Sequence, residues 1–126
     1  MDMERKILIV EDEDVIARVL RIRLEGLGYK VVLASDGQEG LEMVKKEKPV
    51  LAIIDIGLPK IDGNTLCELI RVEPSTKSTK IIILTGKRLV GDMETAFQSG
   101  ADIYMSKPYE WQRLLDHIKK LLGETD

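Results

Sequence analysis

The sequence predicts an α/β fold: a doubly wound parallel sheet of five strands, with five helices covering both faces. Short apolar runs alternate with longer stretches of helical periodicity, and this pair occurs five times along the 126 residues. Strands and helices that alternate at this spacing form βαβ crossovers, which make the strands parallel. The middle apolar runs are continuous rather than alternating, as expected for strands buried on both faces.

The expected strands are five runs of mostly β-branched and aliphatic residues. They cover residues 6–10 (KILIV), 30–34 (KVVLA), 50–54, 80–84 (KIIIL) and 103–105. The third run is the most informative, because four apolar residues lead directly into a carboxylate in LAIIDIGLPKIDG, residues 51–63. Pro59 and the pair Asp62-Gly63 follow, so the chain is expected to turn away soon after Asp55.

Helical spacing of apolar residues marks the segments between the strands. The first helix ends near 26–28 (GLG), as glycines favour. The residues expected on its inward face are Ile16, Leu20, Leu24 and Leu27. The second, residues 38–48, turns Leu41 and Val44 inward and stops before Pro49.

The remaining helices follow the third, fourth and fifth strands. The third helix covers about residues 64–73, with Asp62 or Asn64 as its N-cap. The fourth, residues 89–99, is weaker because a glycine lies in its first turn. The fifth covers residues 110–122. Its apolar stripe comprises Trp111, Leu114, Leu115, Ile118 and Leu122.

Composition predicts one soluble globular domain, residues 1–126, without linkers or repeats. The net charge of −3, from 19 basic and 22 acidic residues, gives no electrostatic case for binding nucleic acid. No apolar run could span a membrane or serve as a signal peptide, so a cytoplasmic location is expected. The single cysteine, Cys67, lies among apolar residues and is expected to be buried rather than nucleophilic.

Several chemically active groups fall where strands end. The run 11–14 (EDED) follows the first strand, Asp55 ends the third, Thr85 ends the fourth, and Lys107 follows the fifth. Functional groups of an open parallel sheet gather at the carboxyl ends of its strands, so we expect these groups to share one edge.

Together these groups suit phosphoryl transfer. Neighbouring carboxylates repel one another, and Mg²⁺, which prefers oxygen ligands, removes that repulsion. A lysine supplies a positive charge for phosphate, and a threonine hydroxyl can donate to a phosphate oxygen. The combination points to a carboxylate nucleophile that receives a phosphoryl group.

Each residue also has a simpler interpretation. Glu13 and Asp14 are better explained as acids at a helix N-terminus, whereas Glu11 and Asp12, nearest the strand, are better explained as metal ligands. Asp55 by itself could be a loop acid, and the hydroxyl and the lysine could be ordinary polar residues. Their coincidence at four strand ends favours the functional interpretation.

Four stretches of the sequence resemble the receiver domain of bacterial two-component response regulators, which is CheY-like. They are VEDE at 10–13, DIGLPKIDG at 55–63, LTG at 84–86 and GADIYMSKPY at 100–109. They occur in the family's order, and the resemblance covers nearly the whole chain. It implies the flavodoxin-like sheet, with strand order 2-1-3-4-5.

The resemblance implies a metal-assisted phosphoacceptor site. Asp55 matches the phosphoacceptor aspartate. Glu11 and Asp12 match the acidic pair that holds Mg²⁺, with Asp12 as the expected direct ligand. The backbone carbonyl of Gly57 matches the third ligand from the protein, beside Asp55 itself.

The resemblance also implies a switch. Thr85 matches the hydroxyl residue that moves towards the phosphoryl group, and Lys107 matches the lysine that pairs with that group. The Lys107-Pro108 bond matches the family's usual cis peptide. Tyr104 matches the aromatic residue that turns inward when Thr85 shifts.

The implied function is phosphorelay signal transduction. A sensor histidine kinase or histidine phosphotransfer protein would present phosphohistidine, and Asp55 would attack it in line. The aspartyl phosphate would shift a two-state equilibrium that a downstream output domain or protein reads. The output face would be the fourth helix, fifth strand and fifth helix, which could also form a homodimer. The domain would catalyse its own phosphorylation and dephosphorylation without being an enzyme for a separate substrate, and would contact neither nucleic acid nor membrane.

Some positions depart from the commoner family pattern. Gly57 and Lys87 flank the phosphoryl site and could change the rates of phosphorylation and hydrolysis. Val90-Gly91 could loosen the fourth helix. Trp111 is interpreted equally well as a core residue or as an anchor for a partner.

Three other functions compete with this interpretation of the sequence. An FMN-binding flavodoxin needs a phosphate-cradling loop after its first strand, where this chain has EDED. A phosphohydrolase of the haloacid dehalogenase type needs aspartates there, where this chain has Glu11 and Glu13, and no cap domain fits this length. A pseudo-receiver that binds partners without phosphorylation is disfavoured by the intact set of Asp55, Thr85 and Lys107.

Overall fold

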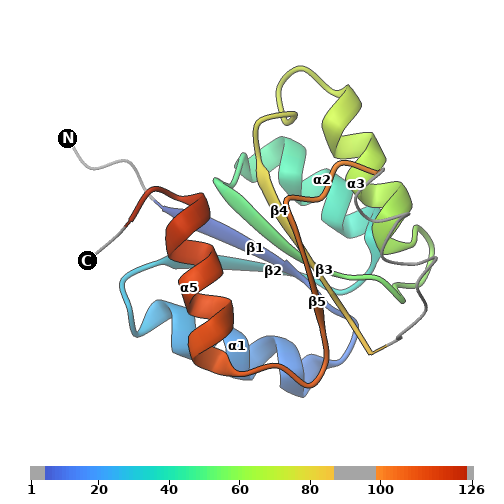
Figure 1. Ribbon diagram of the computed structural model, residues 1–126. Helices are drawn as coiled ribbons and strands as arrows, with labels where there is room; N and C mark the ends of the chain where they lie inside the picture. Colours follow the sequence, from blue (N-terminus) through green and yellow to red (C-terminus); the bar gives the residue numbers. More distant parts are fainter. Residues whose placement is uncertain (1–4, 87–98, 125–126) are drawn as a thin grey trace.

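The computed structural model describes residues 5–86 and 99–124, and it arranges them as a parallel sheet between two layers of helices (Figure 1). The strands are β1 (Lys6–Val10), β2 (Lys30–Ala34), β3 (Leu51–Asp55), β4 (Lys80–Thr85) and β5 (Ile103–Ser106). The described helices are α1 (Asp14–Glu25), α2 (Gly37–Glu47), α3 (Gly63–Val72) and α5 (Trp111–Leu121). The helix predicted at 89–99 lies, except for its last residue, outside the described residues.

The strand order is β2-β1-β3-β4-β5, as predicted. All four pairings are parallel, so every strand ends at the same edge of the sheet. In this register Val10 lies beside Ile54, Asp55 beside Leu84, and Thr85 beside Ser106. The residues that follow each strand are therefore brought close together although they are far apart in the sequence.

Successive residues of each strand point to opposite faces, and each face has its own core. On one face, β-strand side chains such as Ile9 and Ile53 pack with α1 and α5. On the other, Val10 and Ile54 pack with α2 and α3. Figure 1 shows the two helix pairs on opposite sides of the sheet. The free thiol of Cys67 is fully buried in the second core, as predicted, and burial raises its pKa to about 11.

Side-chain caps set where α2 and α3 begin. Asp36 accepts a hydrogen bond from the Glu39 amide at 2.8 Å. Asp62 accepts one from the Thr65 amide at 2.9 Å, which decides between the two caps considered for α3. A carboxylate at this position satisfies an amide that has no partner inside the helix.

The predicted inward face of α1 is partly wrong. Leu20 and Leu24 are buried, but Ile16 is 36% exposed and Leu27 is 46% exposed. Leu27 lies beyond Glu25, where α1 ends, so helical spacing no longer determines its direction. Ala17 takes the inward position of the first turn, and its small side chain fits between α1 and the sheet. Among the described residues, no helix has the length and apolarity needed to cross a lipid bilayer.

Candidate functional site

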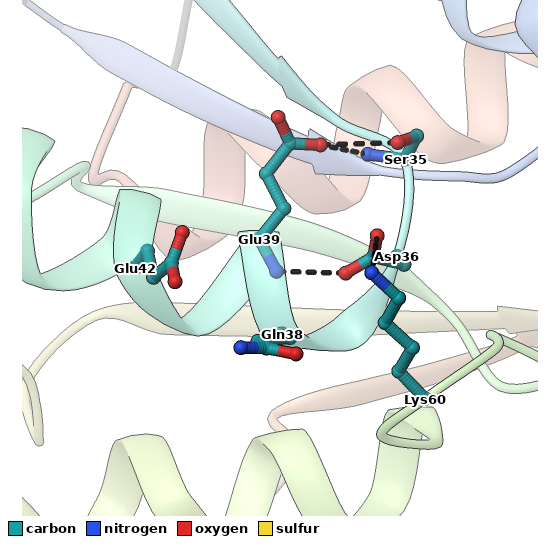
Figure 2. Close-up of a pocket in the computed structure, with 6 residues that line it drawn as sticks. All are labelled: Ser35, Asp36, Gln38, Glu39, Glu42 and Lys60. Atoms are coloured by element: carbon teal, nitrogen blue, oxygen red, sulfur yellow. Dashed lines mark hydrogen bonds and ion pairs between the residues drawn. The ribbon is translucent and has the colours of Figure 1, made fainter.

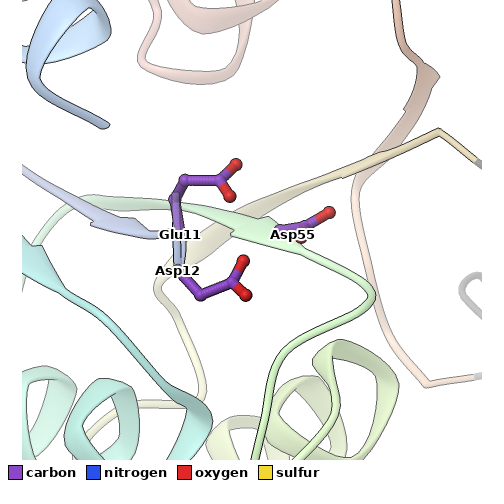
Figure 3. A group of neighbouring side chains, drawn as sticks. All are labelled: Glu11, Asp12 and Asp55. Atoms are coloured by element: carbon purple, nitrogen blue, oxygen red, sulfur yellow. The ribbon is translucent and has the colours of Figure 1, made fainter. Parts of the chain in front are cut away.

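Three carboxylates meet at the carboxyl ends of β1 and β3. Glu11 and Asp12 directly follow β1, and Asp55 is the last residue of β3. One carboxylate oxygen from each lies within 4.8 Å of the others. Figure 3 shows the three side chains gathered beyond the strand ends. The prediction that these acids share one edge is confirmed.

Lys107 joins the cluster from the loop after β5. Its ammonium lies 3.0 Å from Glu11 Oε1 and 3.6 Å from Asp55 Oδ1. Its backbone N–H donates to the carbonyl of Thr85 at 2.6 Å, which fastens the loop to the end of β4. The bond between Lys107 and Pro108 is cis, as the family resemblance implied.

Burial and charge act in opposite directions on Glu11 and Lys107. Burial raises the pKa of Glu11, although hydrogen bonds from Lys107 and from the Glu13 amide oppose this. Burial alone would lower the pKa of Lys107, but the hydrogen bond with Glu11 and the charge of Asp55 outweigh it and raise the pKa. Lys107 therefore stays an ammonium and offsets part of the negative charge of the cluster.

The other predicted residues surround this group. Thr85 is the last residue of β4 and is fully buried. Tyr104, in β5, is half-buried and packs against the core under α2 and α3. Gly57 is exposed in the turn after Asp55, and a Cβ at Gly57 would lie 4.0 Å from Asp55 Oδ2. Lys87 lies outside the described residues.

The donor set fits a hard divalent cation. Its oxygens come from three carboxylates, of which Asp12 is exposed and Asp55 is half-buried. Mg²⁺ binds through one or two carboxylates, keeps several waters, and leaves positions for phosphate oxygens. Three carboxylates and one ammonium have a formal charge of −2, which a divalent cation would balance. The arrangement could therefore hold Mg²⁺ beside a reactive carboxylate.

An apolar surface on α1 was not predicted. Val15, Val19 and Ile22 are exposed and lie on one stripe of the helix. Together with Ile16 they form what we call the α1 patch, which borders a groove that also contains Trp111. Trp111 is half-buried, and the Arg23 guanidinium lies 5.2 Å from its ring centroid. The spacing of Val15, Val19 and Ile22, at i, i+4 and i+7, was the available signal.

Comparison with known proteins agrees with this geometry. The sequence model of the response regulator receiver domain matches residues 7–119. The chain belongs to this family. Receiver domains of this family act in phosphorelay signal transduction, so the predicted fold and the predicted class of function are both confirmed.

The curated relatives of this receiver domain are longer proteins. It is 40% identical over 123 residues to the probable transcriptional regulator ycf27 of Cyanophora paradoxa, covering 98% of this chain and 50% of the relative. The chain thus spans about half the length of the curated relatives it matches.

Solved structures give the same result. A response regulator structure from Chloroflexus aurantiacus has a TM-score of 0.89 and 38% identity, with 96% of this chain and 99% of that chain covered. The receiver domain of a sensor histidine kinase from Pseudomonas aeruginosa, with a magnesium ion coordinated in its active-site cleft, has a TM-score of 0.87 and 30% identity. That match covers 96% of this chain and 99% of the other.

Proposed function

We propose that Asp55 of this receiver domain accepts a phosphoryl group from phosphohistidine, with Mg²⁺ held by Glu11, Asp12, Asp55 and the carbonyl of Gly57. The observation that carries the proposal is the meeting of three carboxylates with an ammonium that touches two of them. The magnesium ion coordinated in the similar Pseudomonas aeruginosa domain supports the same use of the cluster here.

The residues divide the work of the reaction. A carboxylate oxygen of Asp55 attacks phosphorus, the bond from phosphorus to the histidine nitrogen breaks, and the electron pair stays on the imidazole, which takes up a proton from solvent. Lys107 already lies 3.6 Å from Asp55 and offsets charge on the phosphoryl oxygens. Bound Mg²⁺ would neutralise further charge on those oxygens. Thr85, at the adjacent strand end, would donate its hydroxyl to the product.

The same proposal extends to partners. A sensor histidine kinase or phosphotransfer protein would dock beside Asp55, and the α1 patch supports this because α1 begins two residues after Asp12. Thr85 and Tyr104 would transmit the change to the output face, of which residues 89–98 lie outside the described residues. The same face would also form the homodimer. We further propose that the domain catalyses its own dephosphorylation and works in the cytoplasm.

The kind of output is inferred from the name and the length of a relative. The relative from Cyanophora paradoxa is named a probable transcriptional regulator and is about twice as long as this chain. We propose that this receiver controls a transcriptional output in the same way, through a separate output domain rather than through nucleic-acid contacts of its own.

The test is the intact mass of the protein after incubation with acetyl phosphate, with and without Mg²⁺. We expect one phosphoryl adduct that requires Mg²⁺ and is absent from Asp55→Asn. Asp62→Asn is the matched control, because asparagine can still cap α3 through its side-chain oxygen. An equal adduct on Asp55→Asn would contradict the assignment. A folded domain that neither gains a phosphoryl adduct nor binds beryllofluoride would instead favour the pseudo-receiver function.

A further inference from the structure

The segment that leaves Asp55 contains an unfavourable turn. The Ile61 amide donates to the carbonyl of Pro59 at 2.9 Å, a bond that spans only two residues. Lys60, between them, has φ of +70°. This is a γ-turn with positive φ, which is rare and strained, and a residue with a side chain seldom adopts it. Something outside the turn must therefore stabilise it.

The start of α2 supplies that stabilisation. The Gly37 amide donates to the same Pro59 carbonyl at 3.2 Å. The Lys60 ammonium lies 3.4 Å from Asp36 Oδ2, and Figure 2 shows the two side chains side by side. Asp36 also caps α2, so its carboxylate is held in place for this contact. The N-cap of α2 and the first residue of the helix thus hold both the side chain and the backbone of the turn.

Gly37 also approaches the turn more closely than any other residue could. A Cβ on Gly37 would lie 1.9 Å from the carbonyl oxygen of Ile61 and 2.7 Å from its carbonyl carbon. Real Cβ atoms do not come this close to backbone, so a side chain here must displace the turn. Gly40, one turn further along α2, differs: the atoms nearest to a Cβ there are side-chain ends of Val10 and Leu66, at 3.0 and 3.1 Å.

The displacement would be transmitted towards the carboxylate cluster. At the far end of the segment, the Gly63 amide donates to the carbonyl of Ile56 at 3.0 Å. A Cβ at Gly63 would lie 2.6 Å from the carbonyl oxygen of Asp55, so the backbone of Gly63 packs closely against that of Asp55. Ile56 is itself fixed, because its amide donates to Leu84 at 3.1 Å. Residues 57–62 are left to absorb the displacement, and they include Gly57.

We propose that Gly37 and Asp36 are positioning residues for the phosphoryl-transfer site, because they hold the strained turn at Lys60 and thereby fix the carbonyl of Gly57 relative to Asp55. The inference rests on the proposed function, in which that carbonyl is a ligand of Mg²⁺. Neither residue contacts the reacting atoms. Their effect is to raise the fraction of molecules in which the ligand set is complete.

The first test compares Gly37→Ala with Gly40→Ala. Both add one methyl group to a buried glycine of α2, but only the first meets backbone of the turn. We expect Gly37→Ala to weaken Mg²⁺ binding, measured by titration calorimetry, about fivefold or more. Gly40→Ala should stay within about twofold of the unchanged domain even where its melting temperature falls, since melting reports packing and not the ligand set.

The second test leaves α2 unchanged and covers the case in which Gly37→Ala does not fold. Lys60→Gly and Lys60→Val both remove the ion pair with Asp36, but glycine accepts positive φ and valine does not. Lys60→Val should bind Mg²⁺ roughly fivefold more weakly than Lys60→Gly.

The outcomes separate the two proposals. Equal Mg²⁺ affinity for valine and glycine at position 60, in a domain that otherwise binds Mg²⁺ and accepts a phosphoryl group, overturns the positioning role alone. If the unchanged domain neither binds Mg²⁺ nor gains a phosphoryl group, the proposed function fails and the positioning role fails with it.

Discussion

Lys107 touches two of the three clustered carboxylates. Its ammonium is held between Glu11 and Asp55, and the two acids keep it protonated by raising its pKa above the usual value. Before phosphorylation this ammonium would compete with a metal ion for the negative charge of Glu11 and Asp55. After phosphorylation it would be free to pair with the phosphoryl oxygens. The same residue is thus expected to weaken metal binding and to favour the aspartyl phosphate.

The change Lys107→Met tests these two effects together. Removal of a positive charge beside the cluster should tighten Mg²⁺ binding several-fold, whereas the yield of phosphoryl adduct from acetyl phosphate should fall about tenfold or more. Calorimetry and intact mass measure the two quantities. Lys80→Met, at the opposite end of β4, is the control and should change neither. A parallel fall in both would indicate general damage to the site.

Tyr29 shows how one side chain ties the two ends of the chain. Its hydroxyl donates to Glu124 Oε1 at 2.6 Å, and the Arg5 guanidinium lies 4.7 Å from its ring centroid. Burial, followed by the contact with Glu124, raises the pKa of Tyr29 to about 12. The neutral hydroxyl is therefore the form that stabilises the fold.

This shift has a definite sign in a pH titration. Because the folded pKa lies above the usual 10, the contribution of Tyr29 is fully present below pH 10 and is lost as the pH rises towards 12. Ultraviolet absorbance of tyrosinate should show a step near pH 12 that disappears in Tyr29→Phe. Urea unfolding of that variant should also lose less stability between about pH 10 and 11 than the unchanged domain does. Identical titrations would refute the assignment.

At the scale of elements, α1 is apolar on two sides. One side packs Ala17, Leu20 and Leu24 against the sheet, and the other exposes Val15 and Val19 in the α1 patch. A helix buried on one side normally presents polar residues on the other. Exposed apolar side chains beside a cluster of polar groups such as Glu11, Asp12 and Asp55 are typical of a surface that a partner covers.

A charge placed in the α1 patch should slow phosphorylation by a partner kinase without slowing phosphorylation by acetyl phosphate. Val15→Glu should slow phosphoryl transfer from a histidine kinase that phosphorylates the unchanged domain, by about tenfold, because a desolvated contact is lost. Phosphorylation by acetyl phosphate should be unaffected. Val15 is 71% exposed, and the control is Val72→Glu, since Val72 is 76% exposed on α3. Equal slowing by both substitutions would argue against a docking role.

At the scale of the whole molecule, Arg71 connects the end of α3 with the segments that lead into β4 and β5. From the end of α3 it donates to the carbonyls of Thr79 at 2.5 Å, Lys77 at 3.0 Å and Gly100 at 2.9 Å. It also pairs with Asp102 at 2.9 Å, and Asp102 in turn accepts from the Ile81 amide at 2.8 Å. One guanidinium thus fixes the starts of β4 and β5.

Arg71→Met should therefore destabilise the fold as a whole. It leaves the partly buried carbonyls of Thr79 and Gly100 without their side-chain donor and removes one of the partners of Asp102. The expected cost is roughly 2–4 kcal/mol in the free energy of unfolding. Urea denaturation measures this. Arg113→Met, on the exposed side of α5, should change stability by less than about 0.5 kcal/mol. A loss from Arg71→Met no larger than that of the control would show that the network contributes little.

Much of this architecture was determined by the sequence alone. The strand positions and the topology follow from the alternation of apolar runs with helical periodicity, which is local and regular. The meeting of Glu11, Asp12, Asp55 and Lys107 also follows, because parallel strands end at one edge whatever their side chains do. The burial of Cys67 follows from its apolar neighbours.

Other features were decided only by the tertiary structure. Periodicity placed Ile16 and Leu27 inward, but the end of α1 at Glu25 and the fit of Ala17 against the sheet left both exposed. The strained turn at Lys60 could not be foreseen, because it is stabilised by Asp36 and Gly37, more than twenty positions away. Which groups pair, and at what distance, depends on contacts between segments remote in sequence, and local pattern carries no information about those.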